Sequence, residues 1–323
     1  MFQDFANVWT PVAFSAQLRP GRLLRREIAG TALVLFRDAA GVPAALIDRC
    51  PHRGVALSLG TLAAGCVRCP FHGWRFDRAG SCVEVPWNPE VERERLGALA
   101  VPAQELAGQV WIHTSIGTAA AHPPAVHESL LASGTRLTGI EMTWATHWTR
   151  AMENMLDWPH LPFVHRRTIG KDLVHLLGER LDTLIEPHAW GWSVRTALRG
   201  QARPGRLDFR QPNQMNLHIP LSGRTLTLAV ACVPVDARHT RLLLSAARSF
   251  ARAPLLDAFF NRANRRIALE DRAIVESSDP AEVPPVHAEV SVRTDRATLR
   301  FRSYYYSALK GSSINPPSRT SAT

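Results

Sequence analysis

Lysine is nearly absent from this sequence. Only Lys171 and Lys310 are lysines among its 38 basic residues, and the arginines are spread over the whole length without a dense block. The net charge is +10, but a nucleic-acid-binding surface normally gathers its basic residues on one face or stripe. The distribution therefore argues against nucleic acid as a partner. It is compatible with a basic surface that attracts an acidic redox protein.

Long apolar runs are missing as well. The longest, such as residues 226–235, are far too short to span a bilayer, and the N-terminal sequence MFQDFANVW has no basic segment followed by an apolar one. The 323 residues are 46% apolar and 20% charged, which is typical of globular proteins. We therefore expect a cytoplasmic protein of about two domains, with no membrane partner.

Cysteine is scarce and odd in number. Five cysteines in a chain without a secretion signal argue against a disulfide framework and favour thiolates that bind metal. The chain also lacks a glycine-rich dinucleotide motif and the Cys-x4-Cys-x2-Cys spacing of plant-type ferredoxins. Any reductase that serves this protein must then be a separate chain.

Four residues of the types that ligate metals, two Cys and two His, lie in two loops of a strand-rich first domain. Strands are predicted within residues 22–49, and the loops that follow carry Cys50 with His52, and Cys69 with His72. Zinc could use all four side chains on one ion. A Rieske-type [2Fe–2S] cluster instead uses two Cys on one iron and two His on the other. Because each loop contributes one Cys and one His, the spacing favours the two-iron cluster.

The stretch CPHRGVALSLGTLAAGCVRCPFHGWRFDRAGSCVEVP, residues 50–86, resembles the Rieske domain of Rieske non-haem iron oxygenases. The resemblance covers both loops and their flanks. It implies that Cys50 and Cys69 ligate one iron and that His52 and His72 ligate the other. Cys66 and Cys82 lie outside the motif, where we expect them only to pack.

A second constellation lies in residues 152–165, where Asn154, Asp157, His160 and His165 occur within twelve residues. We expect a helix over 150–165 that loosens at Pro162, so that both imidazoles reach one point. Two histidines and a carboxylate can form the facial triad of a non-haem Fe(II) site. From the residues alone, the pair could equally be structural. The segment is similar to the Asn-x-x-Asp-x-x-His-x4-His motif of the same family, most like its vanillate and dicamba O-demethylase branch, which implies iron ligation by both histidines.

The third iron ligand must come from a later element. The resemblance implies Asp271, on a long helix expected over 253–277, while Glu270 and Glu276 are rivals that could also be solvated helix-surface charges. The periodicity of that helix directs six apolar side chains to the core, namely Leu255, Phe259, Ile267, Ala268, Ile274 and Val275.

The expected fold class is α+β. Strands are predicted at 137–148, 181–199, 206–218 and 224–248, the last a hairpin that turns near 236–239, and we expect an antiparallel sheet curled around the long helix. The resemblance implies a helix-grip fold for this domain. We divide the chain into a Rieske domain (1–115), a linker (116–135) with surface His122 and His127, a catalytic domain (136–307) and a disordered tail (308–323).

The resemblance implies a terminal oxygenase. With O2 and electrons from a separate reductase, with or without a ferredoxin, it would hydroxylate a C–H bond of a small organic substrate, and O- or N-demethylation is one outcome. Arene cis-dihydroxylation and simple electron transfer are the alternatives. The family forms homotrimers in which an aspartate, here Asp157, links a cluster histidine, here His72, to the iron ligand His160 of a neighbouring subunit. Asn154 would lie near the iron.

Two surfaces follow from this interpretation. The electron donor is expected to dock at the imidazole edge near His52 and His72, where Arg53 and Arg68 attract acidic groups. The substrate pocket is expected to be walled by the curled sheet and the region 170–220, with Met215, Asn216 and His218 as candidates, each of which could also be an ordinary sheet residue.

Overall fold

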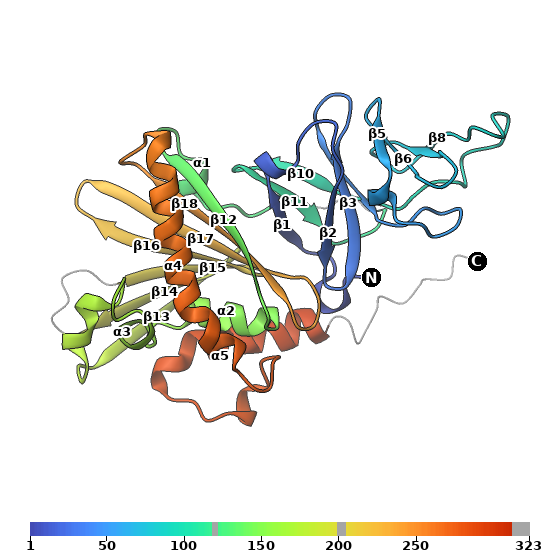
Figure 1. Cartoon of the computed structure of the whole chain (residues 1–323). Coiled ribbons are helices and arrows are strands. Elements are labelled where there is room, and N and C mark those ends of the chain that lie inside the picture. The colour runs from blue at the N-terminus through green and yellow to red at the C-terminus, as the bar shows by residue number, and fades with distance from the viewer. Residues whose placement is uncertain (118–121, 199–204, 312–323) are drawn as a thin grey trace. The chain divides into compact units, whose positions relative to one another are not determined.

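The computed structural model describes residues 1–117, 122–198 and 205–311 (Figure 1). The chain forms two compact units, residues 1–126 and 127–323. The division lies inside the expected linker, whose bounds stay a prediction. Of the expected tail, residues 312–323 lie outside the described residues. No helix in the described ranges is long and apolar enough to cross a membrane.

The first unit consists of three small antiparallel sheets. Their orders are β1-β11-β10, β2-β3-β4-β9 and β5-β6-β7-β8. The strands are β1 (Trp9–Phe14), β2 (Leu24–Ile28), β3 (Thr31–Arg37), β4 (Pro43–Ile47), β5 (Thr61–Ala63), β6 (Cys66–Arg68), β7 (Arg75–Phe76), β8 (Cys82–Glu84), β9 (Ala100–Val101), β10 (Ala103–Leu106) and β11 (Gln109–His113). Short 3-10 helices are η1 (Gln3–Phe5), η2 (Ser15–Gln17) and η3 (Leu57–Leu59).

The core of the first unit supports its two cysteine loops. Cys50 and Cys69 are buried in one apolar cluster with Val34, Phe36 and Phe76. Alternation along β3 directs its branched and aromatic side chains into this cluster. The loops are therefore held by the sheets at their cysteine ends, while the histidine ends remain near the surface.

The second unit is built on one antiparallel sheet of seven strands, in the order β12-β18-β17-β16-β15-β14-β13. The strands are β12 (Arg136–Trp144), β13 (Leu181–His188), β14 (Gly191–Leu198), β15 (Gly205–Arg210), β16 (Gln214–Leu221), β17 (Arg224–Pro234) and β18 (Thr240–Arg248). The hairpin expected within 224–248 is confirmed, because β17 and β18 pair on either side of residues 235–239.

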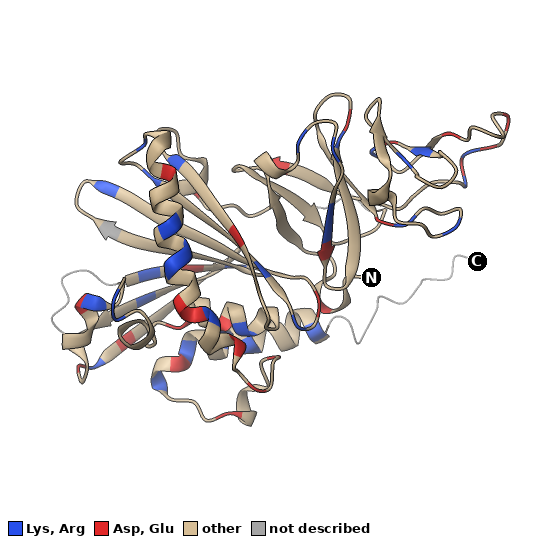
Figure 2. Ribbon diagram, viewed as in Figure 1, with Lys and Arg blue, Asp and Glu red and all other residues tan. Residues whose placement is uncertain are grey.

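Helices cover one face of this sheet. The long helix α4 (Asp257–Glu276) packs on β12, and α2 (Trp148–Leu156) packs on β16, β17 and β18 and contacts α4 and α5 (Arg296–Tyr304) (Figure 1). The remaining helices are short: α1 (Glu128–Leu131), α3 (Leu161–Val164), η4 (Lys171–Leu176), η5 (Pro254–Leu256), η6 (Val286–Ala288), η7 (Arg293–Asp295) and the π-helical η8 (Tyr305–Lys310). The α+β class is confirmed, and acidic and basic residues are interspersed over both units (Figure 2).

The helix expected over 150–165 is two helices. α2 ends at Leu156, Asp157 is extended with φ −84° and ψ 129°, and α3 begins at Leu161. The break therefore precedes Pro159 instead of lying at Pro162, because a proline disfavours helical backbone in the residue before it and cannot donate to the preceding turn. Pro162 lies in the first turn of α3, where its missing N–H is tolerated.

The predicted inner face of the long helix was wrong in part. Leu255, Phe259 and Ile274 are 80%, 67% and 55% exposed in the single chain. The buried positions of α4 are Asn264, Ala268, Asp271 and Val275, which follow one another at helical spacings of three or four. Ala268 and Val275 were predicted correctly, but apolar periodicity missed Asn264 and Asp271, because the buried face also carries polar side chains.

Two other expectations need correction. The segments predicted as single strands, 181–199 and 206–218, belong to hairpins. Gly191 opens β14 with φ +144°, and a Cβ there would lie 2.1 Å from the Phe209 carbonyl oxygen, so glycine permits the close pairing with β15. The expected tail also begins too early, because η8 extends to Lys310 and buries Leu309.

Candidate iron and iron–sulfur sites

The two cysteine loops share one backbone design. In the first, Cys50 N–H donates to the Val55 carbonyl and Gly54 N–H donates to the Cys50 carbonyl. The second repeats these bonds at the same offsets, from Cys69 N–H to Trp74 and from Gly73 N–H to Cys69. Gly54 and Gly73 have φ of +73° and +75°, which glycine adopts without a Cβ penalty. Each loop therefore turns back over its own cysteine.

This design brings the four predicted cluster residues together. The ring centroids of His52 and His72 lie 4.6 Å apart, and His52 stacks on Trp74 with its plane tilted by only 5°. Burial, followed by the adjacent Cys69 thiol, raises the pKa of Cys50 to about 11. A thiolate at this position is therefore stabilised by a cation beside it. Burial, followed by the adjacent His72, lowers the pKa of His52, which favours the neutral form of that imidazole. Two buried thiols and two imidazoles, one pair from each loop, fit a Rieske cluster.

His160, His165 and Asp271 converge in the second unit. Their candidate ligand atoms all lie within 4.8 Å of one another. The Asp271 Oδ1 atom is 3.0 Å from His165 Nε2 and 3.5 Å from His160 Nε2. The break at residues 157–160 makes this possible, because it allows the chain to reverse and present His160 and His165 from opposite ends of α3.

A carboxylate fixes the tautomer of each imidazole. His160 Nδ1 donates to Asp157 Oδ2 at 3.0 Å, and the same oxygen accepts the His160 backbone N–H at 3.1 Å. His165 Nδ1 donates to Glu270 Oε2 at 2.8 Å. A proton on each Nδ1 leaves a lone pair on each Nε2. Both lone pairs face the Asp271 carboxylate.

No hydrogen-bond donor is present among the Asp271 carboxylate oxygen and the two imidazole nitrogens that face it. Asp271 is 5% exposed, and its Oδ1 accepts no well-directed hydrogen bond despite the two nearby nitrogens. Burial lowers the pKa of His165, but Asp271 and Glu270 outweigh it and raise that pKa overall, so the site favours positive charge. Two imidazole nitrogens and one buried carboxylate oxygen without a donor fit a divalent metal with two-His, one-carboxylate ligation, as in non-haem Fe(II) sites.

The remaining predicted residues lie at different distances from this point. Asn154 lines the adjacent cavity. Glu276 accepts the Ala145 backbone N–H and the Arg272 guanidinium, away from the histidines. Sequence reasoning missed the role of Glu270, which was considered only as a ligand or a surface charge. Its position one residue before Asp271 gave no signal of the bond to His165.

An apolar cavity of about 770 Å³, counting the part open to solvent, adjoins the three residues. Its polar lining is Asn154, Asp157, His160, His165 and Asp271. Met215 lines the cavity, as we considered possible, whereas Asn216 and His218 are not among its lining residues. The rest of the described lining is Met142, Met155, Trp158, Leu161, Ile169, Leu207, Leu217, Leu228, Val230, Leu242, Leu244, Ile267 and Ala268.

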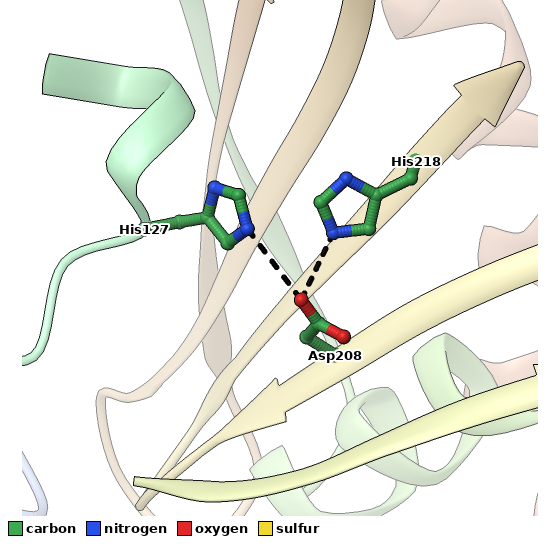
Figure 3. Close-up of side chains that lie close together, drawn as sticks. All are labelled: His127, Asp208 and His218. Atoms are coloured by element: carbon green, nitrogen blue, oxygen red, sulfur yellow. Dashed lines mark hydrogen bonds and ion pairs between the residues drawn. The ribbon is translucent and has the colours of Figure 1, made fainter. Parts of the chain in front are cut away.

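A second histidine–carboxylate group lies on β15 and β16. Figure 3 shows His127 and His218 directed at Asp208, with His218 Nε2 2.9 Å and His127 Nε2 3.5 Å from Asp208 Oδ2. The expectation of a surface His127 was wrong, because it is 4% exposed and caps α1. The other linker histidine, His122, is exposed as expected.

This second group is a hydrogen-bond network and not a ligand set. The Ser129 backbone N–H donates to His127 Nδ1 at 3.0 Å, so the proton of that ring resides on Nε2, which then has no lone pair for a metal. The Arg206 guanidinium also donates to both oxygens of Asp208 and already balances its charge. Burial raises the pKa of Asp208, but His127, His218 and Arg206 hold it well below its usual range.

Two family models match the chain. Residues 8–97 match the Rieske [2Fe-2S] domain, and residues 186–311 match the vanillate O-demethylase oxygenase C-terminal domain. The chain is 29% identical over 299 residues to a chloroplastic chlorophyllide a oxygenase of Chlamydomonas reinhardtii, covering 84% of this chain and 43% of the relative. It is 26% identical to the methylxanthine N3-demethylase NdmB of Pseudomonas putida, covering 86% of this chain and 81% of the relative.

Solved structures share the fold. Pseudomonas putida NdmA with caffeine bound to a mutant form superposes with a TM-score of 0.83 at 22% identity, covering 96% of this chain and 95% of that one. Dicamba monooxygenase bound to 3,6-dichlorosalicylic acid gives 0.75 at 23% identity, covering 94% and 97%. The chain spans about half the length of the chlorophyllide a oxygenases it matches. With a Rieske domain followed by a vanillate O-demethylase type oxygenase domain, the chain belongs to the Rieske non-haem iron oxygenases.

Proposed function

We propose that the protein is the terminal oxygenase of a multicomponent system and hydroxylates a C–H bond of a small organic substrate. The observation that carries the proposal is the convergence of His160, His165 and Asp271 in the lining of an apolar cavity, in a chain that also carries a Rieske domain. One oxygen atom of O2 enters the C–H bond and the other leaves as water. Two electrons and two protons balance the reaction.

Seven side chains would hold the two metal groups. Cys50 and Cys69 would ligate one iron of the [2Fe–2S] cluster, His52 and His72 the other, and the remaining three would ligate a mononuclear Fe(II): His160, His165 and Asp271. The chemistry that these groups supply when bound is one-electron delivery from the cluster and O2 activation at the mononuclear iron. The chain's own contribution is to orient both imidazoles through Asp157 and Glu270 and to keep bulk water from the apolar cavity.

Demethylation is the outcome that the relatives favour. NdmB is a methylxanthine N3-demethylase and dicamba monooxygenase is a further structural neighbour. Hydroxylation of a methyl group on oxygen or nitrogen gives a hemiacetal or hemiaminal, which releases formaldehyde and leaves the O–H or N–H product. The relative named 3-chlorobenzoate-3,4-dioxygenase oxygenase subunit, 32% identical over 160 residues, keeps cis-dihydroxylation as a second candidate. Product analysis with 18O2 separates the two, since a diol retains both labelled atoms.

The partners belong to the proposal as well. A separate reductase, with or without a ferredoxin, would dock where His52 and His72 approach the surface, beside exposed Arg53 and Arg68. We propose a homotrimer in which Asp157 also contacts His72 of a neighbouring subunit. Its side chain is 27% exposed in the single chain. A cytoplasmic location stays an expectation from the sequence, which fractionation of expressing cells would test.

Metal analysis tests the proposal directly. Protein purified without oxygen should contain about three irons and two sulfides per chain and give a Rieske EPR signal after reduction. Asp271→Ala should lose one iron and keep that signal. Glu276→Ala is the matched control on the same helix, because Glu276 bonds Ala145 and Arg272 instead of the histidines. Two irons per chain in both wild type and Asp271→Ala would mean that the second unit binds no iron and that the protein is an electron carrier.

A further inference from the structure

We infer that the substrate is an uncharged, predominantly apolar molecule, and that carboxylate substrates are excluded. This inference rests on the proposed function, because it identifies the class of molecule that occupies the cavity beside the candidate iron site. It is carried by the distribution of polar side chains in the lining of that cavity, which come from the helices and their flanks and not from the sheet.

The polar side chains of the lining belong to α2, α3, α4 and the residues that flank these helices. His160, His165 and Asp271 face one another, Asp157 is bonded to His160, and Asn154 is the one amide among the described lining residues. That lining includes no Arg, Lys, Ser, Thr or Tyr. A substrate carboxylate would therefore have two aspartates and no Arg or Lys beside it among the described lining residues, and its cationic neighbour would be the metal itself.

The sheet contributes to the described lining only side chains without nitrogen or oxygen atoms. Leu207 of β15, Leu217 of β16, Leu228 and Val230 of β17, and Leu242 and Leu244 of β18 line the cavity. Successive strand residues point to opposite faces of a sheet. The alternation therefore directs a continuous row of aliphatic side chains across four strands into the cavity.

On β15 and β16 the charged residues beside these leucines lie on the other face of the sheet, and Arg248 of β18 is paired with Asp257 of α4. Arg206 and Asp208 flank Leu207, and His218 follows Leu217. Arg206 donates to Asp208, and His218 bonds to the same carboxylate (Figure 3). Arg206, the arginine next to Leu207 in the sequence, is thus paired with the buried Asp208 carboxylate on the sheet face away from the cavity. A shift of one residue in either strand would have exchanged the two faces.

The consequence for binding is quantitative. An ion buried without a partner loses its hydration with no compensating contact, and the loss on breaking a buried pair corresponds to about 100-fold or more in affinity. A neutral aryl or alkyl group of the same shape avoids this loss and gains from removal of apolar surface from water. The cavity should therefore distinguish a neutral molecule from its carboxylate analogue by at least about 100-fold.

Matched pairs of methyl ethers test the inference on the iron-loaded enzyme. The pairs are anisole with 4-methoxybenzoate, 2-methoxynaphthalene with 6-methoxy-2-naphthoate, and 4-methoxybiphenyl with 4'-methoxybiphenyl-4-carboxylate. Binding is measured by anaerobic equilibrium dialysis. At least one neutral ether should bind about 100-fold or more tightly than its carboxylate partner. Equal affinity within every pair, tighter binding of a carboxylate, or no binding of any neutral ether overturns the inference.

Charge placement provides the second test. Leu217→Arg puts a guanidinium into the cavity wall and should lower the ratio of affinities, neutral ether over carboxylate ether, by at least about tenfold. Leu184→Arg is the matched control, because Leu184 is 57% exposed on β13 and outside the cavity. An equal change in both variants would mean that long-range charge and not the cavity governs selection.

The two hypotheses fail in different ways. Formaldehyde release by the chemically reduced enzyme in a single turnover reports the proposed function. If a neutral ether binds selectively but no ether or other bound apolar molecule is oxidised by fully iron-loaded protein, the oxygenase proposal fails while the cavity assignment stands. If a carboxylate ether is both bound more tightly and demethylated, the oxygenase proposal stands and the substrate class is wrong.

Discussion

Glu270→Ala should weaken binding of the mononuclear iron although Glu270 is not a proposed ligand. Glu270 Oε2 accepts from His165 Nδ1 at 2.8 Å and from Thr168 Oγ1 at 2.6 Å. Its removal frees the His165 ring to rotate and to move its proton to Nε2, the atom that faces Asp271. Loss of a partner of this kind typically costs about 10- to 100-fold in metal affinity, or about 1.4 to 2.7 kcal/mol.

Anaerobic competition with a ferrous chelator measures this affinity, and EPR of the reduced protein reports the cluster separately. Glu270→Ala should lower iron affinity within that range and leave the Rieske signal unchanged. Glu270→Gln should lose less, because an amide oxygen still accepts the Nδ1 proton. Arg266→Ala is the control, since Arg266 makes only an exposed 3.7 Å ion pair with Glu270. Wild-type affinity in Glu270→Ala would refute the positioning role.

Three further outcomes can be measured. Because its partners depress the pKa of Asp208, its stabilising effect is complete above the unfolded value and fades as pH falls below about 4. Asp208→Asn should thus lower the free energy of unfolding at pH 7 more than at pH 3, and an equal loss at both would contradict this. Gly170→Ala, whose Cβ would lie 1.9 Å from the Leu161 carbonyl oxygen, should lower both Tm and mononuclear iron content, whereas unchanged values would show that α3 adjusts freely. Leu309→Ala should lower the free energy of unfolding in urea by about 2 kcal/mol or more if η8 is part of the core. An unchanged free energy of unfolding would support a disordered tail that begins after residue 307.

The metal-type residues were predictable because their chemistry is local in sequence. Cys50 and His52, and Cys69 and His72, lie within two short loops, and a glycine in each loop allows the turn that exposes the histidine. The same holds for His160 and His165, which flank one short helix. Spacing of this kind survives any arrangement of the rest of the chain, so the sequence alone indicated two metal groups and the α+β class.

What the sequence left open depended on contacts between distant elements. Glu270 lies 105 positions after His165 in the sequence, and Asp208 lies 81 positions after His127, so neither contact appears in a local pattern. Periodicity also assigned exposed residues of α4 to its buried face, because apolar residues do not reveal which stripe of a helix a sheet covers.

The character of the cavity was decided only by tertiary structure. The alternation of Arg206, Leu207 and Asp208 shows that two faces exist, but only the register of β15 to β18 and the placement of α4 make the aliphatic face the wall beside Asp271. The sequence by itself determined which metals the chain is equipped to hold, because ligand type and spacing are local. The fold decided what those metals face, because a pocket is formed by residues that meet only when the chain is folded.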